Sequence, residues 1–216
     1  SHGDIRLTEH FKELCFLHQI KLLDHVIITK DEHFSFSDQN LLGLEGIKDL
    51  TKGNGGFVNA VMAALEKREK HNKRSIEKLA QSYGIVNKTE VKELTELAIV
   101  KRARAIAHST GTVQERFDKI VDLYNSQVNL SHRTSQSVLL QQYSTPAPIG
   151  YMAGVFCGID QPGVQSSYFE PSAGNGLLTI AGNPSDFVVN EIDPTRNRNL
   201  QTQSFKKVLR QDATKP

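Results

Sequence analysis

The sequence predicts an α/β protein in which an all-helical N-terminal domain, residues 1–134, is followed by the first half of a parallel sheet, residues 135–216. In the first part, for example between Phe11 and Leu22, apolar side chains recur at steps of three and four residues, the spacing of one helix face. After about Leu140, short apolar runs end at acidic or turn-forming residues. This alternation is typical of strands and helices that follow one another in a parallel sheet.

The composition is that of an ordinary globular protein, 38% hydrophobic and 23% charged, and the net charge of +2 is too small to indicate a partner. No apolar run approaches the roughly twenty residues of a membrane span, and no signal peptide is recognisable. We therefore expect a soluble, cytoplasmic protein without a membrane partner. Cys15 and Cys157 fit no metal-binding spacing, so no metal is expected. The chain opens at Ser1 and its first methionine is Met62, which favours a piece of a longer protein.

Within the helical domain, local signals predict where helices begin. Asn87 with Glu90 forms an N-cap signal, and Thr112 with Glu115 matches a capping box, in which each side chain bonds the other residue's backbone amide. The glycine-rich run 52–56 predicts a loop. Because no strand precedes this run and no Lys-Ser/Thr pair follows it, we do not expect it to bind phosphate.

In the second part, three runs predict strands: Ser166–Glu170, Phe187–Glu191 and Val208–Arg210. Gly174 and Gly176 follow the first strand, where glycine lets the backbone turn tightly and a ligand lie close to it. Glu191 ends the second strand, and an acid at that position can accept both hydroxyls of a ribose.

The charges near this loop favour one nucleotide cofactor over another. Glu170 would face a pyrophosphate at close range, and Thr179 stands where a dinucleotide-binding loop has its third glycine. S-adenosylmethionine instead carries an ammonium and a sulfonium, which a carboxylate attracts. We therefore expect S-adenosylmethionine, with a nicotinamide-dependent fold as a less favoured alternative.

Four short elements carry a specific family resemblance. They are Gln142–Pro146, Glu170–Gly176, Asn190–Asp193 and Gln211–Ala213. In this order they resemble the cofactor motifs of gamma-class N6-adenine DNA methyltransferases, which belong to restriction–modification systems. The resemblance implies a Rossmann-like S-adenosylmethionine-dependent methyltransferase sheet over 135–216, a helical domain before it, and DNA as the partner of the parent protein.

The same resemblance implies which residues bind the cofactor. Thr145 and the neighbouring backbone would hold the methionine carboxylate, and Glu170 with the glycine loop would line the methionine. Glu191 would bind the ribose, Ile192 would pack on the adenine ring, and Asp212 would contact its amino group. The complete implied set is Tyr143, Thr145, Pro146, Glu170, Pro171, Gly174, Gly176, Glu191, Ile192 and Asp212.

Several of these residues also have a purely structural interpretation. The two glycines fit an ordinary strand-to-helix turn, and Glu191 fits a plain strand-end acid. Asp212 is four residues from the last residue and fits a solvated terminus. Tyr143 fits a core aromatic.

The family's catalytic element is absent. Those enzymes hold the flipped base in an Asn/Asp-Pro-Pro-Tyr/Phe turn, and the sequence contains no Pro-Pro pair. Asn183-Pro184 and Asp193-Pro194 both lack the second proline and the aromatic ring. We therefore expect no catalytic residue in this chain and no methyltransferase activity from it alone.

Other interpretations stay open. The same cofactor loop serves amino-group methyltransferases that act on RNA or protein. A different class is a helical interaction or DNA-binding module of a larger modification complex; basic residues outnumber acidic ones between residues 61 and 119, either to meet phosphates or as a solvated helix face. An open half-sheet also favours a homodimer or strand exchange.

Overall fold

The computed structural model describes residues 8, 11, 24–29, 33–35, 53–127, 144–161 and 167–215. The chain divides into two compact units, Ser1–Leu50 (unit 1) and Thr51–Pro216 (unit 2). Unit 2 contains helices from the N-terminal half together with the three-stranded sheet. The expected domain boundary between residues 134 and 135 therefore falls inside unit 2.

Unit 1 contains a short antiparallel hairpin of β1 (Val26–Ile28) and β2 (His33–Ser35). The β-branched side chains of β1 favour an extended backbone. Beside the hairpin, the Asp24 carboxylate accepts hydrogen bonds from the Ser35 hydroxyl at 2.6 Å and from the backbone N–H of His25 at 2.7 Å. These strands lie in a region that the sequence predicted to be all-helical, and this is a difference from expectation.

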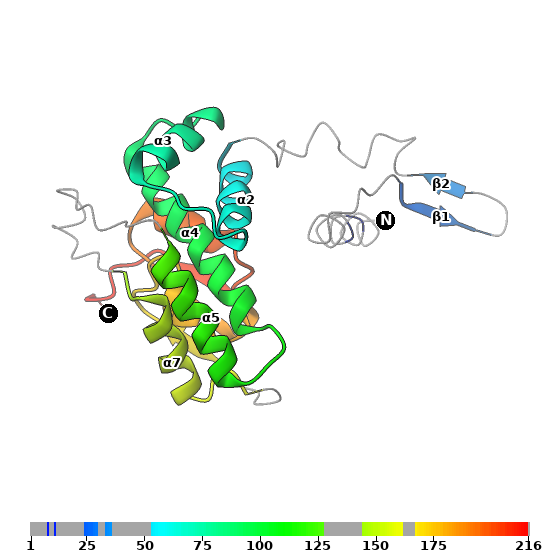
Figure 1. The fold of residues 1–216 in the computed structure, drawn as a ribbon. Coiled ribbons are helices and arrows are strands. Elements are labelled where there is room, and N and C mark those ends of the chain that lie inside the picture. The colour runs from blue at the N-terminus through cyan, green and yellow to red at the C-terminus, as the bar shows by residue number, and fades with distance from the viewer. Residues whose placement is uncertain are drawn as a thin grey trace. The chain divides into compact units, whose positions relative to one another are not determined.

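Unit 2 contains five helices of ten or more residues, and four of them pack around the fifth. They are α2 (Gly53–Glu66), α3 (Lys73–Ser82), α4 (Lys88–Ala107), α5 (Val113–Ser126) and α7 (Ala147–Phe156). The central helix is α4, which contacts the other four (Figure 1). Its first half packs on α2 and α3 around Phe57, and its second half packs on α5 and α7 around Ile120 and Tyr151. None of the described helices is both long and apolar enough to cross a membrane.

The helix starts that the sequence marked are confirmed, but the predicted loop is wrong. Asn87 Oδ1 accepts from the backbone N–H groups of the first turn of α4. Thr112 Oγ1 accepts from Glu115 N at 3.2 Å, and the Glu115 carboxylate accepts from Thr112 N at 2.7 Å. In contrast, residues 53–56 of the glycine-rich run form the start of α2. Burial of Phe57 and its neighbours against α4 outweighs the low helix propensity of glycine.

The sheet has three parallel strands in the order β3 (Tyr168–Glu170), β4 (Phe187–Asn190) and β5 (Lys207–Leu209). Each strand overlaps one of the predicted runs, and the parallel pairing agrees with the expected alternation. Two 3-10 turns, η1 (Leu177–Thr179) and η2 (Pro184–Asp186), connect β3 to β4. The Rossmann-like arrangement as a whole stays a prediction.

Helix α8 (Pro194–Gln201) connects β4 to β5 and packs against α4, so that it links the sheet to the helical layer. A second link is the contact of α7 with η1. There Gly150 lies so close to the Leu177 carbonyl that a Cβ at this position would collide with it. The missing side chain of Gly150 is therefore what permits the close approach of α7 to the loop after β3.

Candidate ligand-binding site

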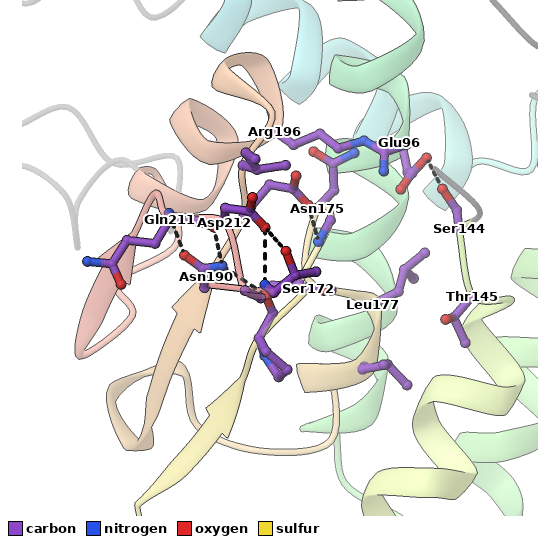
Figure 2. A pocket seen from close by; sticks show the side chains of 18 residues that line it. Glu96, Ser144, Thr145, Ser172, Asn175, Leu177, Asn190, Arg196, Gln211 and Asp212 are labelled. Atoms are coloured by element: carbon purple, nitrogen blue, oxygen red, sulfur yellow. Dashed lines mark hydrogen bonds between the residues drawn. The ribbon is translucent and has the colours of Figure 1, made fainter. Parts of the chain in front are cut away.

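A cavity of about 610 Å³ lies at the carboxyl ends of the three parallel strands. In Figure 2 two strand arrows end beneath the labelled side chains Ser172 and Asn190. The loops after β3, β4 and β5 supply one side of the cavity. Glu96 of α4 and the segment before α7 supply the other. This is the edge of an open α/β sheet at which ligands bind.

Most of the predicted cofactor residues lie together in this cavity. Six of them line it: Thr145, Pro171, Gly174, Glu191, Ile192 and Asp212. The backbone confirms the requirement for glycine in the loop after β3, because Gly174 and Gly176 have φ values of 57° and 100°. The short motifs therefore singled out residues that line one cavity, and their role in binding a ligand stays a prediction.

Four predicted residues do not line the described cavity. Tyr143 lies outside the residues that the structure describes. Pro146 is the N-cap of α7, and Gly176 is the residue before η1. The Glu170 carboxylate turns back on its own loop and accepts from Ser172 N at 3.0 Å. The expected approach of Glu170 to a cofactor is thus replaced by a local turn bond.

Glu191 lines the cavity, and backbone hydrogen bonds fix both of its carboxylate oxygens. It is buried, its Oε2 accepts from Gly174 N at 2.9 Å, and its Oε1 accepts from Asp193 N at 2.8 Å. A carboxylate oxygen has a second lone pair, so each atom can accept one further hydrogen bond from a ligand. The same contact occupies the Gly174 N–H, which therefore cannot donate to a phosphate.

Ile192 and Asp212 occupy the more open part of the wall. Ile192 is 46% exposed, which is high for an apolar side chain beside a cavity. Asp212 accepts from the hydroxyl and the backbone N–H of Thr214, at 2.7 and 3.1 Å. The Thr214 hydroxyl bond, followed by the backbone bond, lowers the pKa of Asp212, so its carboxyl is ionised at neutral pH.

Asn190 is a residue that the sequence analysis did not include in the site. Its amide nitrogen donates to the carbonyls of Pro171 and Gln211, both at 2.9 Å, and its oxygen accepts from Gln211 N at 2.8 Å. One buried side chain thus joins the loops that follow β3 and β5. The sequence signal that could have identified Asn190 as a site residue was its position at the end of a predicted strand.

Behind the cavity lies a buried polar network. Arg196 Nε donates to Glu93 Oε2 at 2.7 Å, and both side chains are 4% exposed. Asn175 donates to the same Glu93 oxygen at 2.8 Å and accepts from Asn199 at 2.9 Å. Burial alone would lower the pKa of Arg196, but the charges of Glu93 and Glu96 outweigh burial and raise it. The Arg196 guanidinium is therefore permanently charged.

Glu96 belongs to the cavity wall and was also missed. It accepts from the Ser144 hydroxyl at 2.7 Å (Figure 2). Burial, reinforced by the neighbouring Glu93, raises the pKa of Glu96, and Arg196 opposes this shift. The sequence signal for this residue was an acidic pair, Glu93 and Glu96, three residues apart among the apolar side chains of residues 91–100.

The two proline-containing turns have structural roles. Asp193 caps α8 by accepting from Thr195 N and Arg196 N, at 2.9 and 3.0 Å. Asn183 caps η2 through Ser185 N at 3.1 Å. Within the described ranges, no three His, Cys, Asp or Glu side chains are grouped so as to hold a metal ion.

Comparisons with known proteins find similarity in the first residues of the chain. The model of the RadC-like JAB domain family matches residues 1–41. UPF0758 proteins of Acinetobacter baumannii strains ATCC 17978, AB307-0294 and AB0057 are each 49% identical over 39 residues. That match covers 18% of this chain and 17% of the length of each relative. No solved structure matches the chain.

These findings contradict the identification as an N6-adenine DNA methyltransferase. The similarity that they show is to RadC-like and UPF0758 proteins, so the methyltransferase activity, the restriction–modification context and S-adenosylmethionine as the cofactor are corrected. The alternative amino-group methyltransferase and the helical interaction module gain no support either. The physical reason is that a glycine turn after one parallel strand and an acid after the next can serve many ligands, so these motifs located a site without defining its chemistry.

Proposed function

We propose that unit 2 binds a small neutral nucleoside in the cavity at the carboxyl ends of β3, β4 and β5. The observation that carries this proposal is the geometry of Glu191. Its two carboxylate oxygens are fixed by separate backbone N–H groups, and the residue lines a cavity of about 610 Å³. A rigid carboxylate with a free lone pair on each oxygen is suited to a pair of neighbouring ribose hydroxyls.

The residues beside Glu191 fit the rest of a nucleoside. Ile192 is adjacent in the chain, lines the cavity and offers a half-exposed apolar surface on which a base can pack. Asp212 lines the same cavity and is an acceptor for an exocyclic amino group. Ligand sites commonly combine an apolar surface with a few fixed polar groups in this way.

Charge limits the class of ligand. Of the described residues that line the cavity, Glu96, Glu191 and Asp212 are acidic and Arg196 is basic, and Arg196 is already paired with Glu93. The Gly174 N–H donates to Glu191, so it offers nothing to a phosphate. Repulsion between carboxylates and phosphate oxygens therefore disfavours nucleotides relative to nucleosides.

Isothermal titration of the full chain with adenosine, guanosine, uridine and ATP tests this proposal. We expect at least one nucleoside to bind and ATP to bind more weakly than adenosine. Ile192→Ala should weaken nucleoside binding about tenfold through lost apolar contact, without unfolding the protein because the side chain is half exposed. Glu90→Gln, on α4 away from the cavity, is the control. Failure of all nucleosides to bind, or tighter binding of ATP, would refute the proposal.

The similarity to a RadC-like JAB domain concerns residues 1–41. No described residue that lines the cavity precedes Glu96, so the proposed binding function belongs to unit 2. DNA as a partner of the parent protein and a homodimer through the open sheet stay predictions.

A further inference from the structure

Arg196 carries a hydrogen-bond donor that the fold leaves unused. The residue lines the cavity, and its side chain is 4% exposed. Its Nε and Nη2 atoms donate to the Glu93 carboxylate, at 2.7 and 3.5 Å. Among the described residues, Nη1 has no hydrogen-bond partner, yet it is not one of the fully enclosed atoms that lack one. The N–H groups of Nη1 therefore border accessible space.

This nitrogen lies beside the glycine turn that follows β3. A Cβ at Gly174 would be 3.8 Å from Arg196 Nη1 and, apart from its chain neighbours, would meet no other described residue within 4 Å. The N–H of the same glycine donates to Glu191 Oε2 at 2.9 Å. A free donor and a fixed carboxylate therefore lie beside one glycine in the cavity wall.

Arg196 and Glu191 are close in electrostatic terms without bonding each other. In the part of the chain that the structure describes, Arg196 forms its ion pair with Glu93 and none with Glu191. Burial lowers the pKa of Arg196, but the charges of Glu93, Glu96 and Glu191 raise it. A ligand that fills the cavity removes Nη1 from water, so the ligand loses affinity unless it supplies an acceptor.

A hydroxyl group satisfies both residues at once, because it donates one hydrogen bond and accepts another. A carbonyl oxygen accepts from Arg196 but has no hydrogen for Glu191. A phosphate also accepts from Arg196, but the Glu191 carboxylate repels it. An ammonium donates to Glu191 but has no lone pair for Arg196.

We infer that Arg196 and Glu191 together bind a ribose hydroxyl, so that the cavity selects ribonucleosides over deoxynucleosides. This inference rests on the proposed function; it adds the class of sugar and makes Arg196 a specificity-determining residue. A site whose buried polar groups bond a ligand hydroxyl rejects the analogue without that hydroxyl, because those groups are then left unpaired.

Isothermal titration of the full chain compares adenosine, guanosine and uridine with their 2′-deoxy and 3′-deoxy counterparts. The variant Arg196→Lys keeps a cation that can pair with Glu93 but lacks a second nitrogen for the ligand. Arg198→Lys is the matched control, because Arg198 lies on the same helix, is exposed and bonds Thr195. Thermal unfolding checks that each variant folds.

Gly174→Ala is a second variant, which leaves the pair of Arg196 and Glu93 in place. Its methyl group would occupy the space in front of Nη1, where we expect the hydroxyl. The φ of 57° at Gly174 lies in the left-handed region, which alanine adopts at some cost in stability. This variant decides the inference if Arg196→Lys does not fold.

We expect the wild-type chain and Arg198→Lys to bind at least one ribonucleoside about tenfold or more tightly than a deoxy counterpart. In Arg196→Lys and Gly174→Ala the preference should fall below about threefold, because only ribonucleoside affinity declines. Equal binding of ribo and deoxy forms by the wild type overturns the inference and leaves the proposed function intact. A tenfold preference that survives in a folded Arg196→Lys or Gly174→Ala variant does the same. Binding of no nucleoside by the wild type overturns both.

Discussion

Asn190 shows how much of the site depends on one side chain. Its three hydrogen bonds, two donated to the carbonyls of Pro171 and Gln211 and one accepted from Gln211 N, hold the loops after β3 and β5 beside the end of β4. An aspartate at this position would have the right size but no N–H to donate. Its carboxylate would also face two carbonyl oxygens in a buried place.

We therefore predict that Asn190→Asp lowers the free energy of unfolding by about 2 kcal/mol or more. Asn183→Asp is a matched control, because Asn183 is an exposed cap that only accepts a hydrogen bond and aspartate caps equally well. Its effect should stay within about 0.5 kcal/mol. Urea denaturation of both variants measures the difference. Equal stability of the two variants would mean that Asn190 does not hold the loops together.

Polar residues elsewhere in the protein differ in how far along the chain their hydrogen-bond partners lie. Asp193, Thr112 and Asn87 act within a few positions of their own place in the chain, and such caps can be recognised in the sequence. Glu96 and Arg196 contribute to one polar cluster from segments a hundred residues apart. No local pattern specifies such a meeting, which is why the sequence analysis missed both.

At the scale of elements, the contact of α7 with η1 controls the shape of the cavity. Gly150 of α7 lies against the Leu177 carbonyl, and Leu177 and Leu178 line the cavity. Because the contacting atom belongs to the backbone, a new methyl group cannot be accommodated by a side-chain rotation. The two elements would have to separate.

Gly150→Ala should therefore destabilise unit 2 by about 1–3 kcal/mol through overpacking, although alanine itself favours a helix. It should also weaken ligand binding, because η1 moves. Ile149→Ala, at the neighbouring position but 60% exposed, is expected to change stability by no more than about 0.5 kcal/mol. Thermal unfolding and titration with adenosine measure both effects. A Gly150→Ala variant as stable as wild type would show that the contact tolerates a side chain.

The sequence predicted the three strands of the parallel sheet, but it missed the hairpin of β1 and β2 and the start of α2. Apolar runs that end at polar residues predicted all three strands of the parallel sheet. In contrast, the glycines of residues 53–56 predicted a loop where α2 begins, because tertiary burial of Phe57 dominates there. Helix propensity determines the backbone conformation where tertiary packing is weak, and packing determines it where side chains are buried.

For the whole molecule, the buried Glu96 links stability to pH. Because the folded protein raises the pKa of Glu96, it binds a proton more tightly than the unfolded chain does. The stability that this protonated carboxyl contributes is fully present below the ordinary pKa of 4.5, and it is lost as the pH rises through the folded value. The melting temperature of the wild type should therefore decline over that range.

Glu96→Gln removes the titrating group and should flatten this part of the profile, so that the variant melts at a higher temperature than wild type near neutral pH. Calorimetric melting between pH 4 and pH 8 at constant ionic strength measures both curves, with Glu90→Gln as the control expected to follow wild type. Parallel curves for wild type and Glu96→Gln would show that Glu96 does not titrate differently in the folded state.

The sequence by itself determined the helix caps, the three strands and the glycine turn after β3, because each depends on residues within a few positions of one another. Six of the ten residues that it singled out as one site line the cavity. Only the tertiary structure decided that Glu170 bonds its own loop, that Asn190 joins two neighbouring loops, and that Glu93, Glu96 and Arg196 meet in one buried cluster. These outcomes depend on the packing of α4 and α8 beside the sheet, and long-range packing leaves no local pattern in the chain.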